Sequence, residues 1–155
     1  MHLDRVIDHL SSGASQLDAD HWLAARDEVL GAVCRIAVTR HPLGFIHFDL
    51  SPLVNLPPGS SLRLHSWDAG KHFVDAAGSL HDHTWDLTSW VIEGEIRNTT
   101  FLPRFDPMGA YSAAQVEYGA VNEFRSVGRY SLDNGVSQNY QAGTVYRMPS
   151  RVVHN

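Results

Sequence analysis

The chain has 155 residues, of which 43% are hydrophobic and 19% charged, and its formal net charge is -5. This length and composition predict one soluble globular domain with a buried core. Nucleic acid and polyanionic membrane surfaces are disfavoured as partners, because no run of basic residues exceeds two and Lys71 is the only lysine. No apolar run approaches the roughly 18 residues of a membrane span. The N-terminus lacks the apolar core of a signal peptide, so a cytoplasmic protein is expected.

Two amphipathic helices are predicted at the start of the chain. Residues 3–10 carry apolar side chains at i, i+3, i+4 and i+7, and Ser11-Ser12-Gly13 ends this first helix. The second begins at Asp18 or Asp20, either of which can cap free backbone N–H groups, and its apolar face runs on to residue 37. Neither helix shows ligand spacing, so both are expected to pack onto a sheet. The single cysteine, Cys34, excludes an intrachain disulfide.

From residue 40 onward, short apolar or alternating runs separated by Pro, Gly, Asn and Asp predict β-strands. Asp133-Asn134-Gly135 is expected to form a hairpin turn, because Asn and Gly tolerate positive φ. Short strands at this spacing indicate a barrel or a sandwich rather than a parallel sheet. The expected strands span 44–50, 60–67, 84–92, 95–101, 121–131, 136–141 and 144–148.

His81-Asp82-His83 is the first candidate for metal binding. Residues i and i+2 of a strand project from the same face, so both imidazoles would point into one space. Imidazole is the commonest side-chain metal ligand. With 10 His in the chain, however, random order would give about 0.6 His-x-His pairs, so the pair needs support from elsewhere. His154 supplies this support. Gly143 is expected to open a strand, Pro149 to end it in a turn, and His154 to lie on the strand that returns.

The joint spacing of these residues resembles the two motifs of the cupin superfamily. The first motif, Gly-x5-His-x-His-x3-4-Glu-x6-Gly, is matched at His81, His83 and Gly94, where a tight hairpin is expected. The second motif, Gly-x5-Pro-x-Gly-x2-His-x3-Asn, is matched at its first Gly, its Pro and its His. Those three positions are Gly143, Pro149 and His154.

The chain departs from both motifs at specific positions. Asp75 stands where the first motif opens with Gly, and Arg151 replaces the internal Gly of the second. The motif Glu falls on Leu87, or on Thr88 with the longer spacer, and neither can supply a carboxylate. The resemblance covers roughly residues 60–155. It implies an all-β fold, a double-stranded β-helix or jelly-roll-like cupin barrel, with residues 1–155 as one domain divided into a helical segment, 1–39, and a barrel, 40–155.

A metal shell of three histidines is similar, within the cupins, to that of the thiol dioxygenases, of which cysteine dioxygenase is the best known. The resemblance implies a mononuclear non-haem Fe(II) oxygenase in which His81, His83 and His154 hold the metal. It would act with O₂ on a small polar metabolite such as a thiol, an amino acid or a carboxylate. The cysteine–tyrosine crosslink of that family has no counterpart, so cysteine oxidation itself does not follow. The alternatives are a Zn, Mn or Ni cupin acting as isomerase, lyase or hydrolase, and a non-catalytic cupin that binds a small molecule.

An arginine in the cavity would bind a carboxylate substrate, because its planar fork makes two parallel hydrogen bonds. Arg63 is the nearest candidate by strand position, and it alternates with His65 and Trp67 on a face that is either a polar cavity or a solvated surface. The sequence leaves open which of the other candidates face inward. Tyr130 and Arg147 are the other candidate catalytic residues, and Arg97, Arg125 and Tyr146 are further candidates for substrate binding.

Three neighbouring residues have open interpretations. Strict alternation makes Asp86 a surface residue opposite to His83, but it could also orient an imidazole or, at a bulge, become a ligand. His65 is a weaker candidate ligand, and His72 follows a glycine on a loop expected at the barrel mouth. The resemblance also implies a possible homodimer formed through outer strands.

Overall fold

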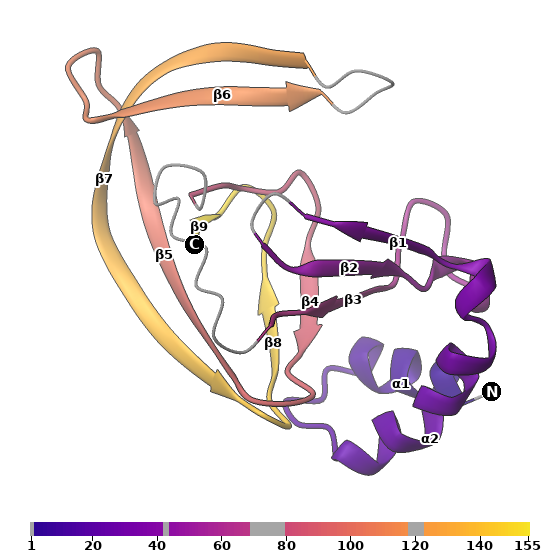
Figure 1. Ribbon diagram of the computed structural model, residues 1–155. Helices are drawn as coiled ribbons and strands as arrows, with labels where there is room; N and C mark the ends of the chain where they lie inside the picture. Colours follow the sequence, from indigo (N-terminus) through magenta and orange to yellow (C-terminus); the bar gives the residue numbers. More distant parts are fainter. Residues whose placement is uncertain (1, 42–43, 69–79, 118–122) are drawn as a thin grey trace.

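The computed structural model describes residues 2–41, 44–68, 80–117 and 123–155. Two helices precede a set of antiparallel strands (Figure 1), as the sequence predicts for an all-β protein with an N-terminal helical segment. Within these ranges no helix is long and apolar enough to cross a membrane. The helices are α1 (His2–Ser11) and α2 (Ala19–Gly31), with 3-10 turns at Val33–Arg35 and Ser51–Leu53. The strands are β1 (Ala37–Arg40), β2 (Ile46–Asp49), β3 (Arg63–Ser66), β4 (Leu87–Trp90), β5 (Glu95–Phe105), β6 (Tyr111–Glu117), β7 (Glu123–Gln141), β8 (Val145–Met148) and β9 (Val153–His154).

Side-chain hydrogen bonds fix the N-terminal ends of both helices. Asp18 caps α2 by accepting a hydrogen bond from the backbone N–H of Asp20. Of the two capping residues that the sequence left open, the structure therefore has Asp18. Glu28 of α2 accepts hydrogen bonds from the first backbone N–H groups of α1, at His2 and Leu3 (2.7 and 3.2 Å). α2 ends at Gly31, so the prediction that its apolar face continues to residue 37 is wrong. That segment instead forms a 3-10 turn and the start of β1.

The strands form three antiparallel sheets: β1-β2-β3, β4-β8 and β6-β7-β5-β9. In the first sheet, Phe48 and Leu64 are cross-strand partners on the face that packs against the helices. Since successive side chains alternate between faces, the partners His47 and His65 lie on the other face. The buried core between helices and sheet consists of Leu3, Val6, Ala25, Val29, Ala32, Ile36, Leu50 and Leu53.

The predicted hairpin at Asp133-Asn134-Gly135 is wrong, because β7 runs through these residues without reversing. The register with β5 shifts between Thr100 and Leu102, and Asn134 there has a φ of 53°. One class of β-bulge contains a residue with positive φ, as the favoured two-residue hairpin turns do, so the two cannot be told apart from residue type. The bulge bends a long strand at a point where the sequence suggested two shorter ones.

The predicted hairpin at Gly94 is also wrong in its pairing. Gly94 does form a tight turn with a φ of 75°, but β4 pairs with β8, whereas β5 pairs with β7 and β9. The turn therefore passes the chain from one sheet to another. Its carbonyl accepts a hydrogen bond from Ala142, beside Gly143, which has a φ of 90°. The motif glycines thus lie at two adjacent turns that both need left-handed backbone.

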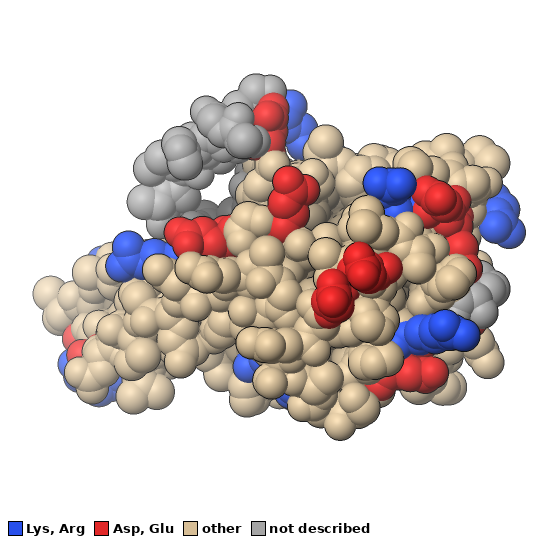
Figure 2. Space-filling model, turned by 90° about the horizontal axis from the view of Figure 1, so that it is seen from below, with Lys and Arg blue, Asp and Glu red and all other residues tan. Residues whose placement is uncertain are grey.

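Charged side chains of both signs are interspersed on the face shown in Figure 2. Lys and Arg side chains lie singly or in small groups there, next to acidic ones, and form no continuous basic stripe on that face. A nucleic-acid interface depends on clustered basic residues, so this face offers no support for one.

Candidate metal centre

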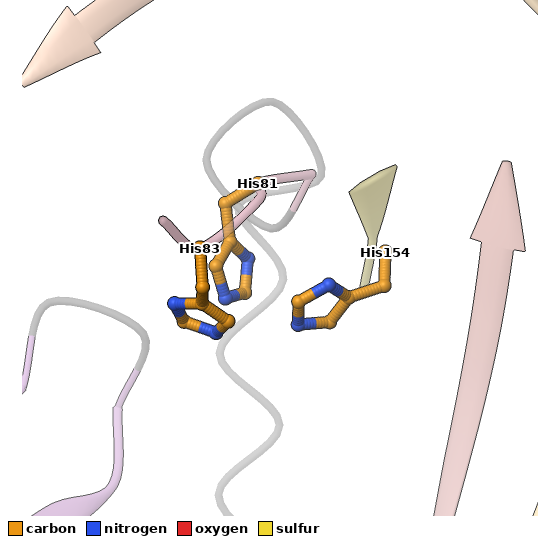
Figure 3. Close-up of side chains that lie close together, drawn as sticks. All are labelled: His81, His83 and His154. Carbon is orange, nitrogen blue, oxygen red and sulfur yellow. The ribbon is translucent and has the colours of Figure 1, made fainter. Parts of the chain in front are cut away.

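Three histidine rings converge at one place in the fold. His81, His83 and His154 each direct a ring nitrogen toward a common space (Figure 3), and these potential ligand atoms all lie within 4.8 Å of one another. Nitrogens bound to one metal at the usual 2.0–2.1 Å are roughly 3 Å apart, so small side-chain rotations are sufficient to complete the shell. The structure therefore contains a three-histidine group that could hold a metal ion.

Backbone pairing explains the convergence. His81 and His154 exchange two backbone hydrogen bonds of 2.9 Å, which makes them directly opposed residues of an antiparallel bridge. Opposed residues place their side chains on the same face, and their ring centroids are 4.3 Å apart. His83 lies two residues after His81, outside any regular strand, and its ring centroid is 4.9 Å from that of His81, so the His-x-His spacing does bring the two rings together. Its carbonyl is held by the N–H of Arg151 at 2.7 Å.

Hydrogen bonding sets the tautomer of His154. This side chain is only 7% exposed, and its Nδ1 lies 3.0 Å from the carbonyl oxygen of Val152. A carbonyl can only accept, so Nδ1 carries the proton and donates it. Nε2 then keeps its lone pair for a metal, which is the arrangement that metal-bound histidines usually show.

The electrostatics of the centre favour neutral imidazoles. Burial, together with the neighbouring His81, His154 and Arg63, lowers the pKa of His83 to about 4. Burial also lowers the pKa of His154, although its hydrogen bond to Val152 acts in the opposite direction. Both imidazoles are therefore uncharged at neutral pH, and each has one ring nitrogen with a free lone pair for a metal.

Asp86 holds the chain that carries His154 and does not join the cluster. Its Oδ1 accepts a hydrogen bond of 2.9 Å from the backbone N–H of Ser150, in the turn between β8 and β9. The same turn contains Arg151, whose guanidinium lies 3.8 Å from the carboxylate of Asp82. Of the three interpretations left open for Asp86, ligation thus receives no support from the geometry. None of the three included this tether, because the contact spans 64 residues.

A polar sheet face lies beside the histidines. The guanidinium of Arg63 is 5.5 Å from the centroid of the Trp85 ring, and Trp85 is in turn 4.9 Å from the His83 ring. Farther along this face, the rings of His65 and His47 are 5.4 Å apart. Desolvation, followed by the charges of His47 and Arg63, lowers the pKa of His65 to about 4. Arg63 and His65 thus belong to the face next to the centre, although His65 is not part of the metal-binding group.

Sequence reasoning missed the contribution of the first sheet to this face. His47 is the cross-strand partner of His65, and its pKa is lowered by burial and by Arg63. The pKa of His41 is lowered by burial and then by His81. Alternation within β2 could have shown that His47 and the apolar Phe48 lie on opposite faces of the strand. The pairing of β2 with β3 was needed to place His47 beside His65.

The other candidate residues lie elsewhere. Arg147 donates hydrogen bonds to the carbonyl oxygens of Leu10 and Ala14, at the C-terminal end of α1, where a cation is favourable. Tyr130 packs edge-on against Phe105 where β7 meets the far end of β5. Tyr130 lies six residues along β7 from Val136, which pairs with Thr100, the β5 partner of His154. At 3.3 Å per residue, Tyr130 is therefore about 20 Å along the strand from the level of His154.

The remaining candidates also lie outside the cluster. Arg97 and Arg125 are exposed on β5 and β7, and Tyr146 stacks on Tyr140 with ring centroids 4.2 Å apart. His72 lies outside the described residues. Among the sequence candidates for substrate binding, the structure therefore brings Arg63 to the neighbourhood of the histidines.

Comparison of the chain with protein-family models, with curated proteins and with solved structures gives no match. The class that fold and site define is a β-rich protein with two N-terminal helices and a three-histidine group that could bind a metal ion.

Proposed function

We propose that the protein is a mononuclear non-haem iron oxygenase built on a cupin barrel, with Fe(II) held by His81, His83 and His154. The observation that carries this proposal is the convergence of three imidazoles, with no carboxylate in the group found among the described residues. Such a donor set is neutral. A divalent ion held by it keeps its full charge and several open positions for an anionic substrate and O₂.

The residues present suit such an ion in two respects. His154 presents Nε2 because its Nδ1 proton is donated to Val152, and the low pKa of His83 keeps its ring unprotonated at neutral pH. When bound, Fe(II) would supply the redox chemistry that O₂ requires in order to react with an organic substrate. The chain itself supplies orientation and charge, through the tethered turn that carries His154 and the polar face beside His83.

Arg63 is proposed to bind a carboxylate of a small polar substrate. Its guanidinium lies over the Trp85 ring, which favours one orientation of the planar fork. The pKa values of His41, His47, His65 and His83 are all lowered, first by desolvation and then in part by positive neighbours. Arg63 is a cause of the lowering in each of them, so its guanidinium supplies a positive charge beside neutral imidazoles, and an anion would be stabilised there.

The test is metal analysis followed by O₂ uptake. Protein purified without chelator or affinity-tag nickel is expected to bind one equivalent of Fe(II) and to consume O₂ with one of a panel of small thiols, amino acids and carboxylates. His81→Ala, His83→Ala and His154→Ala are each expected to lose metal binding and O₂ uptake, whereas His9→Ala, at an exposed position of α1, keeps both. Stoichiometric zinc with no O₂ uptake on any member of the panel would contradict the oxygenase proposal.

We also propose that the chain forms a homodimer through the outer part of the β5–β6–β7 sheet. Large apolar side chains are exposed along this region, among them Met108 (89%) and Phe124 (72%). The β6–β7 end extends away from the rest of the fold (Figure 1), and these side chains are exposed in the part of the chain that the structure describes. A second copy would cover them.

A further inference from the structure

Asn98, on β5, has a buried amide oxygen that lacks a hydrogen-bond partner. The residue is 7% exposed, and its Oδ1 makes no hydrogen bond to any described part of the chain. Buried polar atoms in folded proteins are nearly always paired, because loss of water without a replacement partner is costly. An orphaned carbonyl oxygen in the interior therefore needs an explanation, and a bound molecule is one.

Strand pairing puts Asn98 on the side of the sheet where the histidines lie. Thr99 and Asn155 exchange backbone hydrogen bonds, so Thr100 and His154 form the adjacent, closely spaced pair with side chains on one face. Asn98 is two residues from Thr100 and shares that face. It is a diagonal neighbour of His154, at about 7 Å. Thr99 points the opposite way, where its hydroxyl meets that of Ser137 near the surface.

We propose that Asn98 is a ligand-binding residue of the metal centre, accepting through Oδ1 a hydrogen bond from an N–H or O–H group of the molecule bound beside the metal. This rests on the proposed function only in requiring that the three histidines hold a metal. Carbonyl oxygens accept and cannot donate, so Asn98 selects for a donor. Arg63, by contrast, can only donate, so the two residues recognise opposite kinds of group. The favoured ligand is a small molecule that carries both an anionic group and an amine, amide or hydroxyl.

A pair of chelators that differ in one N–H group tests this assignment. Acetohydroxamate and N-methylacetohydroxamate chelate a metal through the same two oxygens, but the second has no N–H. Their affinities for Co(II)-loaded protein are measured from the visible absorption band of the metal. In Asn98→Leu we expect unchanged Co(II) stoichiometry, at least tenfold weaker binding of acetohydroxamate, and less than twofold change for the N-methyl compound.

The matched control is Asn139→Leu, which removes an exposed amide on β7 and is expected to change neither affinity. Thermal unfolding gives a second readout, because replacing an unpaired buried amide with an apolar side chain is expected to raise Tm of the metal-free protein by a few degrees. If Asn98→Leu does not fold, Asn98→Ala is used in the same comparison.

The outcomes separate the two proposals. Equal weakening of both chelators would mean that Asn98 merely shapes the site, and no weakening would mean that it does not reach the ligand; either result overturns the assignment. A fall in Tm with unchanged affinities would make Asn98 a structural residue. Absence of O₂ uptake would contradict the oxygenase proposal but leave the chelator comparison intact.

Discussion

Among the side chains near the centre, Asp86 shows the difference between a metal ligand and a residue that holds a ligand in place. A carboxylate three residues after His83 is a natural candidate to complete a site of two histidines and one carboxylate, and such sites hold iron in many oxygenases. In this protein the Asp86 carboxylate instead accepts the N–H of Ser150 and so orders the turn before β9. His154 is placed by β9, so Asp86 acts on the centre through the backbone.

Asp86→Ala is expected to lower stability without removing the metal. Loss of the hydrogen bond to Ser150 should lower the free energy of unfolding by about 1 kcal/mol, which is roughly 2–4 °C in Tm for a chain of this size. Metal stoichiometry should remain at one per chain, whereas His83→Ala loses it. Thermal unfolding together with metal analysis checks both parts, and loss of the metal in Asp86→Ala would restore Asp86 as a ligand.

At the scale of the element, the turn between β8 and β9 carries strain at Arg151. This residue has a φ of 67°, in the left-handed region that costs a residue with a Cβ about 1–2 kcal/mol. It is also the position where the second cupin motif has glycine. The turn therefore keeps the backbone shape that the motif glycine would allow, although the residue type is different.

Arg151→Gly is expected to be more stable than Arg151→Ala by about 1 kcal/mol. Both variants lose the exposed ion pair with Asp82, so the difference between them isolates the backbone effect. Chemical denaturation of the two proteins measures it. Equal stability would show that the turn relaxes to a different backbone conformation in the alanine variant.

The contact between α1 and α2 should make stability depend on pH. Hydrogen bonds from the backbone of His2, offset in part by desolvation and aided by Leu3, lower the pKa of Glu28 below its ordinary value of 4.5. A group with a lowered folded pKa stabilises the protein above its unfolded pKa, and the effect is lost as pH falls through the folded pKa. The contribution of Glu28 is therefore complete at neutral pH, begins to fall near pH 4.5 and is lost once the pH is below the lowered folded pKa.

Glu28→Gln is expected to lower the free energy of unfolding at pH 7 by about 1 kcal/mol, because the amide has one acceptor oxygen where the carboxylate uses two and carries no charge at the N-terminus of α1. The difference from the unsubstituted protein should shrink as pH falls below 4.5 and vanish once Glu28 is protonated in both states. Thermal unfolding at a series of pH values tests this. A difference that stays constant with pH would mean that the carboxylate charge is not involved.

The whole molecule has more surface than its size requires. Its accessible area is 10806 Å², against roughly 7,800 Å² for an average folded monomer of this mass. The excess on one chain, about 3,000 Å², is somewhat more than the roughly 1,000–2,500 Å² that an obligate interface covers on each partner. Much of the outer β5–β7 region is apolar and exposed, which is consistent with the proposed homodimer.

Sedimentation velocity is expected to show a dimer at micromolar concentration. Phe124→Glu should shift the protein toward monomer, because a charge would be desolvated at the interface, whereas Leu30→Glu, at an exposed site on α2, should not. Tm should rise with protein concentration if the dimer is the folded species. A monomer at every concentration, with Tm independent of concentration, would contradict the homodimer.

Local patterns in the sequence were sufficient for α1 and for the pair His81 and His83. The i, i+3, i+4 spacing of α1 and the His-x-His alternation both depend on backbone geometry within a few residues, and the structure has them as predicted. The motif spacing also selected His154, which lies with the other two histidines. The helix and the His-x-His pair follow from residue order because each depends on one element, whereas the approach of His154 to His81 depends on long-range pairing and was indicated by the motif resemblance.

Only the tertiary structure decided how the elements pair. Asn134 permits a hairpin or a bulge equally well, and contact with β5 selects the bulge. Arg147 has the chemistry of a carboxylate-binding residue, but in the fold the end of α1 lies within its reach. Asn98 looks like an ordinary strand residue until the pairing of β5 with β9 puts it on the same face as His154. Local sequence limits the backbone conformations of a residue, whereas its partners depend on long-range packing, which is why the neighbours of the three histidines could not be predicted as well as the histidines themselves.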